Sequence, residues 1–278
     1  MRILVFGASG LLGKYLLREW KGDELVGLSS KDADIRDPQA VRWAVQANRP
    51  DWIILSAAYT DVDGCETNPD LAFAVNFTGA VDVARAAAEY QSRLLFVSTD
   101  YVFDGEKSTP YEVDDPRNPQ TVYGRSKAQA EIEISRILPA SCIVRTAWLF
   151  GTGGKCFPDT ILKLSASRPF IEVVDDQRGC PTYARDLARA IVELCRRGAS
   201  GIVHATNAGD CTWFEFASEI VRESGLPADV GPTTTEKFPR PAKRPKYSVL
   251  SSESLLPYAE MPDWRSALRK YLIERLSS

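Results

Sequence analysis

Short apolar runs alternate with amphipathic stretches along the first two thirds of this 278-residue chain. The runs typical of buried strands cover residues 2–6, 24–28, 52–55, 93–97 and 141–144. Between them, apolar residues recur at helical spacing over residues 11–20, 38–48, 69–90 and 123–138. A repeated strand–helix order is typical of a parallel sheet with helices on both faces. We therefore predict an α/β protein with a doubly wound parallel sheet of the Rossmann type.

The alternation becomes less regular after residue 145. Glycine and proline interrupt the chain at 151–154 and again at 227–245. Residues 171–174 and 201–204 have the composition of further sheet strands, and residues 212–224 and 263–276 have helical spacing. We therefore predict a first domain of residues 1–150, to which strands near 171–174 and 201–204 return, and a smaller C-terminal lobe of residues 151–278.

The charge balance limits the partners of the chain. Lys and Arg number 34 against 37 Asp and Glu, and the two signs are mixed along the sequence, which gives a net charge of −3. Such a surface has no electrostatic reason to bind nucleic acid or an anionic membrane. No apolar run approaches the length of a bilayer span, and glycines interrupt the apolar N-terminus where a signal peptide would be continuous. We expect a cytoplasmic protein without nucleic-acid or membrane partners.

The chain has one histidine, His204, and six widely spaced cysteines without a CxxC pair. Zinc sites with two or more imidazoles are thereby excluded, and no metal site is predicted. The cysteines are expected to be reduced and mostly buried thiols. His204 follows a late predicted strand, where a packing role is favoured over a catalytic one.

The first predicted strand runs directly into the turn GASGLLG at residues 7–13, and a helix follows at once. Gly7 would form the tight turn, Gly10 would let the backbone approach a pyrophosphate, and Gly13 would let the helix pack against the strand. The free N–H groups and the dipole of this helix start would bind phosphate. The spacing predicts dinucleotide binding, with contacts from Gly7, Ser9, Gly10, Leu11, Leu12 and Gly13.

The end of the second strand lacks the acidic residue that binds the ribose 2′-hydroxyl of NAD in many such folds. The sequence there is Ser29, Ser30 and Lys31, whose hydroxyls and cation suit a 2′-phosphate better. We therefore expect NADPH as the cofactor. NADH remains possible, because a solvated turn at this place would tolerate both. Asp34 and Ile35 lie where an adenine would be held.

Tyr123 and Lys127 open a predicted helix four residues apart, so they share one face of it. A nearby ammonium lowers the pKa of a phenol, which makes proton exchange with a carbonyl or an alcohol feasible near neutral pH. Thr99 ends the fourth strand, and ligands bind at the ends of parallel strands. Because the tyrosine–lysine spacing alone is common by chance, the glycine turn and Thr99 are what make the pair a catalytic candidate.

Eight segments follow one another along nearly the whole chain: GASGLLG (7–13), AAYTDVDGCETNPDLAFAVN (57–76), STDYVFDG (98–105), YGRSK (123–127), RTAWLFG (145–151), DQRGCPTYARDLA (176–188), HATNAGDCTWFEFA (204–217) and RPKYSVL (244–250). In these segments the chain resembles the extended short-chain dehydrogenase/reductases, and within them the family of dTDP-4-dehydrorhamnose reductases. This resemblance implies hydride transfer from NADPH to C4 of a nucleotide sugar, dTDP-4-dehydro-L-rhamnose, to give dTDP-L-rhamnose.

The resemblance also implies roles for individual residues. Tyr123 would donate a proton to the substrate, Lys127 would lower the pKa of that phenol and hold the nicotinamide ribose, and Thr99 would bind the sugar carbonyl oxygen. Further cofactor contacts are implied for Ala57, Ala58, Tyr59 and Asn76. Further substrate contacts are implied for Asp100, Tyr101, Trp148 and, at the diphosphate, Arg244. Packing at the edge of the core is the alternative for Tyr59, Tyr101 and Trp148.

Two other functions are compatible with the same segments. One is reduction of a different 4-keto nucleotide sugar, since residues 151–155 and 233–245 are expected to shape the substrate pocket. The other is a non-catalytic role like that of the regulatory subunit of methionine adenosyltransferase, which resembles the same family. Some family members bind magnesium through glutamates at a dimer contact; Tyr15 stands at the matching place here. Neither metal nor dimer is therefore carried over, and a monomer or a homodimer is expected.

Overall fold

The computed structural model describes residues 1–277 and contains a central sheet of six parallel strands. In spatial order these are β10 (Gly201–His204), β5 (Cys142–Thr146), β4 (Arg93–Thr99), β3 (Trp52–Leu55), β1 (Arg2–Phe6) and β2 (Glu24–Leu28). The chain passes from β1 to β2 and then returns to β3 on the other side of β1. The point where the strand order reverses therefore lies between β1 and β3. The predicted doubly wound parallel sheet is confirmed.

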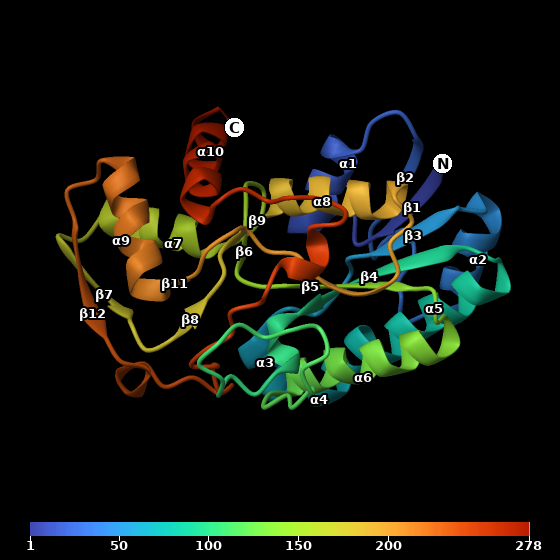
Figure 1. The fold of residues 1–278 in the computed structure, drawn as a ribbon, viewed down its shortest axis with the longest axis horizontal. Helices are drawn as coiled ribbons and strands as arrows, with labels where there is room; N and C mark the ends of the chain where they lie inside the picture. Colours follow the sequence, from blue (N-terminus) through green and yellow to red (C-terminus); the bar gives the residue numbers. More distant parts are fainter. Residues whose placement is uncertain (278) are drawn as a thin grey trace.

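Helices cover both faces of this sheet, as Figure 1 shows. On one face lie α1 (Leu11–Glu19) and α8 (Ala184–Arg196), and on the other lie α2 (Pro38–Asn48), α5 (Ala80–Glu89) and α6 (Val122–Ile137). The inner strands β1, β3, β4 and β5 are buried on both sides, which explains why their sequences are apolar without alternation.

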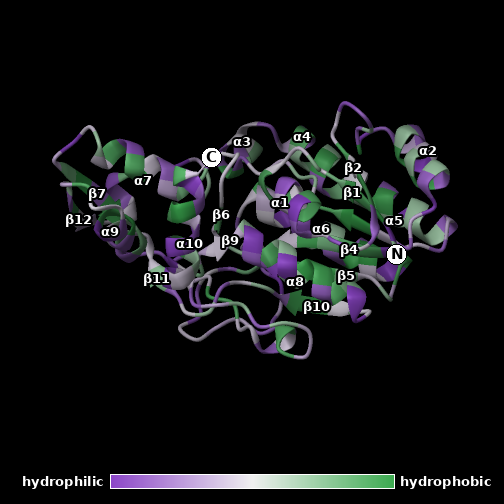
Figure 2. Cartoon of the chain, turned by 90° about the horizontal axis from the view of Figure 1, so that it is seen from above, coloured by the Kyte–Doolittle hydropathy of each residue, from purple (hydrophilic) through white to green (hydrophobic). Residues whose placement is uncertain are grey.

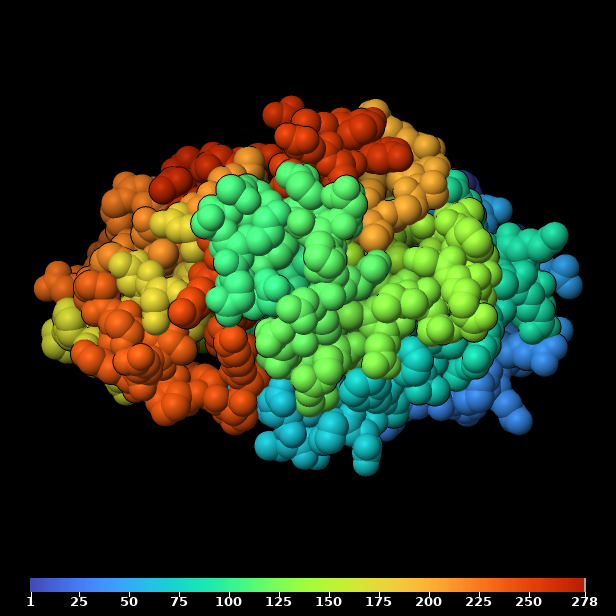
Figure 3. Space-filling view, turned by 60° about the horizontal axis from the view of Figure 1, so that its bottom comes forward, coloured from blue at the N-terminus to red at the C-terminus, as the bar shows by residue number. Residues whose placement is uncertain are grey.

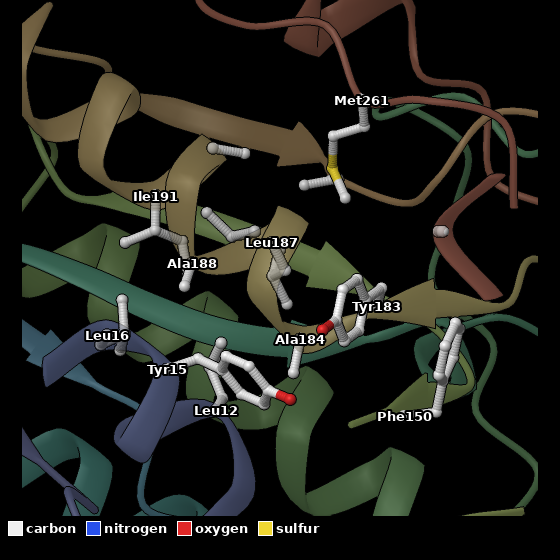
Figure 4. Close-up of a cluster of buried hydrophobic side chains, with 14 of the residues drawn as sticks. Leu12, Tyr15, Leu16, Phe150, Tyr183, Ala184, Leu187, Ala188, Ile191 and Met261 are labelled. Carbon is white, nitrogen blue, oxygen red and sulfur yellow. The ribbon is translucent and has the colours of Figure 1, made fainter. Parts of the chain in front are cut away.

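The two faces of the sheet carry separate apolar cores. Ile3 of β1 packs toward α1 and α8, whereas its neighbour Leu4 packs toward α2 and α5. Figure 4 shows Tyr15 of α1 facing Tyr183 and Ala184 at the start of α8. The two tyrosine rings meet edge to face, with their centroids 5.7 Å apart. In Figure 2 the strands are coloured mainly as hydrophobic, while the helices combine hydrophobic and hydrophilic surfaces.

The C-terminal lobe has its own small sheet and three helices. Strand β7 (Phe170–Val174) pairs in parallel with β12 (Asp229–Thr233), beside α7 (Phe157–Ser165), α9 (Trp213–Ser224) and α10 (Trp264–Leu276). The prediction that residues 171–174 return to the central sheet is therefore wrong, whereas residues 201–204 do form its edge strand. The residues of β7 alternate between exposed and buried, which suits a two-stranded ribbon covered on one side.

Two shorter strand pairs lie between the central sheet and this ribbon (Figure 1). In one of them β6 (Leu149–Phe150) runs parallel to β9 (Thr182–Tyr183). In the other β8 (Arg178–Gly179) runs antiparallel to β11 (Cys211–Thr212). These short pairs position the segments that follow β5 and precede α9.

Most predicted helices are found close to their predicted bounds. The helix predicted at 69–90 consists of α4 (Pro69–Phe73), a π-helical turn (Ala74–Gly79) and α5. By length and composition this run, Pro69–Glu89, is apolar enough to cross a membrane, but 50% of the apolar window is buried inside the protein. It therefore has the features of a core helix. The sequence analysis did not predict α3 (Val62–Thr67), α7 or α8.

The six cysteines are free thiols, as expected. Five of them are buried, and Cys156 is half-buried.

Candidate active site

A cavity of about 830 Å³ opens at the carboxyl ends of the central strands. Predicted residues that line it are Gly7, Ser9, Gly10, Leu11, Leu12, Gly13, Ser30, Asp34, Ile35, Ala57, Ala58, Thr99, Asp100, Tyr101, Tyr123, Lys127 and Trp148. Figure 3 shows the orange C-terminal lobe lying against the green segment that follows β4, with a hollow between them. The structure thus brings most of the predicted cofactor and substrate residues to one place between the two lobes.

The glycine turn has no room for side chains at two of its positions. Gly7 has a φ of +89°, and a Cβ there would lie 2.5 Å from the backbone nitrogen of Ala57. A Cβ on Gly13 would lie 2.2 Å from the carbonyl oxygen of Gly7. Gly10 is the N-cap of α1 and offers no side-chain cap to that helix. The first N–H groups of α1 are thereby left for a pyrophosphate, so the turn fits a dinucleotide.

Near the end of β2, only some of the residues that were predicted to suit a 2′-phosphate line the cavity. Ser30 lines the cavity, but Lys31 does not, and the hydroxyl of Ser29 donates a hydrogen bond to a neighbouring aspartate. The cation at this end is instead Arg36, which follows the predicted adenine site. Its guanidinium pairs with Asp34 at 2.5 Å.

Tyr59 and Asn76 do not line the cavity, although a cofactor contact was expected of both. The buried Asn76 accepts a hydrogen bond from the backbone N–H of Tyr59 at 2.8 Å and donates one to its carbonyl oxygen at 3.0 Å. The same amide donates to the hydroxyl of Ser126 at 3.2 Å. Asn76 therefore fixes the segment after β3 to α6, one residue before Lys127.

The three predicted catalytic residues meet where β4 ends beside the start of α6. Tyr123 and Lys127 lie one turn apart on α6, and Thr99 is the last residue of β4. Tyr123 and Thr99 both line the cavity, and the Thr99 hydroxyl is near enough to the phenol to lower its pKa. The Thr99 hydroxyl donates a hydrogen bond to Asp100 Oδ1 at 2.9 Å. Two hydroxyl groups thus face the same cavity.

Burial controls the protonation of the tyrosine and the lysine. Burial raises the pKa of Tyr123, while the nearby Thr99 hydroxyl opposes this. Burial lowers the pKa of Lys127 to about 7, and the charge of Glu131 opposes this. The ammonium donates to the carbonyl oxygen of Val97 at 2.7 Å. The expected lowering of the Tyr123 pKa is therefore not found here, and the phenol is protonated at neutral pH, as a proton donor must be.

A buried ionic network lies directly behind this trio. Glu131, one turn after Lys127, accepts a hydrogen bond from Ser98 at 2.5 Å. It also accepts hydrogen bonds from Arg117 at 2.6 Å and from Arg145 at 2.8 Å. Burial favours the neutral acid, but the two guanidinium groups together hold the pKa of Glu131 below its usual range. Because Ser98 precedes Thr99, the network fixes the end of β4 against α6.

The predicted hexose contacts lie at the opposite end of the cavity from the adenine site. Asp100 is buried, and burial raises its pKa to about 6. The ring of Tyr101 meets that of Tyr123 edge to face, with centroids 5.7 Å apart. Trp148 lines the cavity and stacks on Trp213, a residue that the sequence analysis missed.

Two lining residues were not among the predicted site residues. Lys155 lies in the glycine-rich segment 151–155, which was expected to shape the pocket. Trp213 is the first residue of α9, directly after the capping box formed by Thr212 and Glu215. The cap was a usable signal for the start of the helix, but nothing in the sequence indicated which element this tryptophan would face.

Arg244 lies beside the cavity and does not line it. Its Nη2 donates to Asp63 Oδ2 at 2.9 Å, and its Nη1 donates to the carbonyl oxygen of Ala242 at 3.3 Å. Asp63 belongs to α3, so the segment that carries Arg244 is tied to the first domain by this ion pair. The expected position near a substrate diphosphate is not tested by these contacts.

His204 has a packing role in the structure. It is buried at the end of β10, with its Nε2 3.3 Å from Nη1 of Arg145. Burial and the charge of Arg145 lower the pKa of His204 to about 4, so the ring is neutral near pH 7. Within residues 1–277, no cluster of three or more His, Cys, Asp or Glu side chains is arranged to hold a metal ion.

The sheet, the glycine turn and the tyrosine–lysine helix define an NAD(P)-dependent oxidoreductase of the extended short-chain dehydrogenase/reductase type. A family model described as RmlD substrate binding domain matches residues 1–277, and the chain belongs to this family.

Individual relatives are similar over almost their full length. A dTDP-4-dehydrorhamnose reductase of Mycobacterium tuberculosis is 42% identical over 278 residues, which cover 96% of this chain and 91% of that protein. A dTDP-4-keto-6-deoxy-D-glucose reductase of Streptomyces niveus is 38% identical, covering 91% of this chain and 89% of that protein. The crystal structure of a dTDP-4-dehydrorhamnose reductase from Bacillus anthracis in complex with NADP has a TM-score of 0.95 at 38% identity, covering 98% of this chain and 99% of that one.

Proposed function

We propose that the protein reduces the 4-keto group of dTDP-4-dehydro-L-rhamnose with NADPH and releases dTDP-L-rhamnose. The observation that carries this proposal is that Thr99, Tyr123 and Lys127 line the same cavity as the glycine turn. The relatives from Mycobacterium tuberculosis and Bacillus anthracis, both named dTDP-4-dehydrorhamnose reductases, support the choice of substrate.

The cofactor is held by the backbone at one end of the site and by side chains at the other. The N–H groups at the start of α1, after Gly10, bind the pyrophosphate. Ser30 and Arg36 bind the 2′-phosphate of NADPH, because a guanidinium is the stronger partner for that group. NADH is accepted more weakly, since it lacks the phosphate but keeps every other contact. Lys127 holds the nicotinamide ribose.

The bound cofactor supplies the hydride that reaches C4 of the sugar. Tyr123 donates its phenolic proton to O4, the oxygen on which negative charge develops. Thr99 donates a hydrogen bond to the same oxygen and thereby stabilises that charge. The ammonium of Lys127, one helical turn below, stabilises the phenolate that remains, and Glu131 favours the charged form of this lysine.

The sugar lies between Asp100, Tyr101 and Trp148, with its diphosphate directed toward Arg244. Every group in this scheme comes from one chain, so the activity is available to a monomer and to a homodimer alike. No metal ion takes part. The small nucleotide-sugar substrate and the net charge of −3 agree with a cytoplasmic enzyme.

A second 4-keto nucleotide sugar is the competing substrate. The relative from Streptomyces niveus, named for dTDP-4-keto-6-deoxy-D-glucose, is 38% identical to this chain. Both sugars present a 4-keto group to the same two hydroxyls, and they differ only in stereochemistry at the hexose end. A regulatory role without catalysis is disfavoured, because Thr99, Tyr123 and Lys127 are all present and assembled.

The test is NADPH oxidation with the two sugar nucleotides side by side. Purified protein is mixed with NADPH and enzymatically prepared dTDP-4-dehydro-L-rhamnose or dTDP-4-keto-6-deoxy-D-glucose, and the products are identified by NMR. We expect the higher kcat/KM with dTDP-4-dehydro-L-rhamnose and dTDP-L-rhamnose as its product. Preference for the other sugar would overturn the substrate assignment, and no oxidation with either would overturn the reaction.

A further inference from the structure

Both faces of the Trp148 ring are covered. On one face lies Trp213, with ring centroids 3.5 Å apart and an angle of 7° between the planes. On the other lies Gly179: a Cβ built there would meet the adjacent ring atoms Cε2, Nε1 and Cζ2 of Trp148 at 2.6, 2.7 and 2.8 Å. The three distances are nearly equal, and the shortest is to Cε2, the atom bonded to both of the others. The built Cβ therefore lies above the face of the ring and not beside its edge. Its nearest neighbours are all atoms of Trp148, whereas a point between the two rings would meet both indoles.

The stack continues behind Trp213 and is anchored at each layer. Phe157 packs against Trp213 with centroids 4.4 Å apart, so the outer face of this indole is also occupied. Trp213 begins α9 directly after its capping box, and Gly179 pairs with Cys211 across β8 and β11. Trp148 itself has a φ of +43°, a conformation that a bulky residue keeps only when its surroundings enforce it.

The packing of Trp213 and Gly179 against Trp148 determines which part of the indole a ligand can contact. Because Trp213 stacks on one face and Gly179 lies over the Cε2 side of the other, we expect a sugar to meet the rim of the indole and not to stack on it. Within residues 1–277, no group accepts a hydrogen bond from the indole N–H of Trp148, although the residue is half-buried and lines the cavity. An indole N–H is a donor only, and the hydroxyl and ring oxygens of a hexose are acceptors.

We propose that Trp213 is a positioning residue for the nucleotide sugar. It holds Trp148 so that the indole rim, with its Nε1–H, donates a hydrogen bond to a hexose oxygen. Gly179 serves the same purpose from the other face, because any side chain there would displace the ring. This inference rests on the proposed function, and it adds to it two residues that hold the indole of Trp148 in place.

The test compares Trp213→Leu with Trp43→Leu, a change at an exposed tryptophan on α2 far from the stack. Three constants are measured: the Kd of dTDP-L-rhamnose, the KM of the keto sugar and the Kd of NADPH. For Trp213→Leu we expect the first two to rise about tenfold, as for one lost hydrogen bond, with the Kd of NADPH unchanged. Trp43→Leu should leave all three at the wild-type values, and Trp213→Phe, which keeps a stacked ring, should recover most of the loss.

Two further variants separate positioning from general damage. Gly179→Ala pushes the ring from the opposite face, and its non-positive φ adds no backbone strain; it should raise KM in the same way. In a Trp148→Phe background, Trp213→Leu should raise KM no further, because the effect passes through the indole of Trp148. Near-ultraviolet circular dichroism reports whether the stack is lost.

Outcomes that contradict the inference are distinct from failure of the reaction. An unchanged KM in Trp213→Leu or in Gly179→Ala, with wild-type turnover and an altered tryptophan spectrum, would overturn the positioning role alone. A full additional effect of Trp213→Leu on top of Trp148→Phe would do the same. A wild-type protein that binds no sugar nucleotide at all would overturn the proposed function first, and this inference with it.

Discussion

The two ends of the cavity are built in different ways. The proposed cofactor end is made mainly by the backbone of one continuous turn, in which Gly7 and Gly13 have no room for a Cβ. The proposed hexose end is made by side chains, among them Asp100, Trp148 and Trp213, from segments far apart in the sequence. Under the proposed function, substitutions at the second end would change the sugar that binds without disturbing the dinucleotide.

The two ends also differ in how they treat buried charge. Behind the catalytic trio, the carboxylate of Glu131 is matched by two guanidinium groups. At the proposed hexose end, the buried Asp100 accepts a hydrogen bond from the hydroxyl of Thr99 through Oδ1, and its Oδ2 is buried without a hydrogen-bond partner in the part of the chain that the structure describes. Burial raises the pKa of Asp100 to about 6. The first arrangement holds a fixed ion inside the fold. The second leaves a carboxyl group whose charge depends on pH and on what binds beside it.

The largest effect on ligand binding is expected from a substitution in the glycine turn. In Gly13→Ala the new methyl would lie 2.2 Å from the carbonyl oxygen of Gly7, so the turn must shift away from its phosphate-binding geometry. We expect the Kd of NADPH, measured by fluorescence titration, to rise by about 100-fold or more. In the control Gly22→Ala the methyl meets open space, and NADPH affinity should be kept although the φ of +82° adds strain. A Gly13→Ala protein that binds NADPH normally would refute a backbone-built cofactor site.

The second comparison uses two buried groups whose ionisation changes the stability of the fold in opposite directions as pH rises. The pKa of Asp100 is raised in the fold, so its neutral form is favoured there and stability falls as pH rises from about 4 to 6. The pKa of His204 is lowered to about 4, so stability is gained as pH rises from 4 toward 6.5. Each contribution is on the order of 3 kcal/mol between the limits of its window.

Urea unfolding at several pH values measures both contributions. The stability of Asp100→Asn relative to wild type should increase as pH rises from 4 to 6, because the variant has no carboxyl group to ionise. The stability of His204→Gln relative to wild type should decrease over a similar window. If the free energy of unfolding depended on pH in the same way for wild type and Asp100→Asn, ionisation of Asp100 would not contribute to the pH dependence of stability.

A smaller effect is expected at the 2′-phosphate. Removing the guanidinium in Arg36→Ala should raise the Kd of NADPH about tenfold, as for a lost charge-assisted hydrogen bond, and should leave the Kd of NADH unchanged. Lys31→Ala is the matched control, because Lys31 does not line the cavity. If Lys31→Ala weakened NADPH binding and Arg36→Ala did not, the cation at the 2′-phosphate would be Lys31, as the sequence of residues 29–31 predicts, and not Arg36.

Local patterns were enough to predict the cofactor end. The order of strands and helices and the positions of Gly7, Gly10 and Gly13 depend on neighbours in sequence, and the structure keeps them. The strand at residues 171–174 was misplaced because its apolar composition does not say which partner strand it meets; that partner, β12, lies far along the chain.

Contacts between distant segments were not predictable in the same way. Trp213 faces Trp148 only because β8 and β11 pair, and Arg244 meets Asp63 across 181 residues of sequence. Asn76, of which a cofactor contact is expected, does not line the cavity and is hydrogen-bonded to the backbone of Tyr59. The roles that the resemblance implies for single positions stay predictions, while the contacts of these residues with distant segments required the folded chain.

The central claim is that Tyr123 supplies the proton for reduction of the sugar. The most direct measurement compares kcat for NADPH oxidation by wild type and by Tyr123→Phe with dTDP-4-dehydro-L-rhamnose, with the Kd of NADPH measured for both proteins. We predict that kcat falls by about 100-fold or more, the usual contribution of a general acid, while the Kd of NADPH stays the same. Equal kcat values for the two proteins would contradict the account.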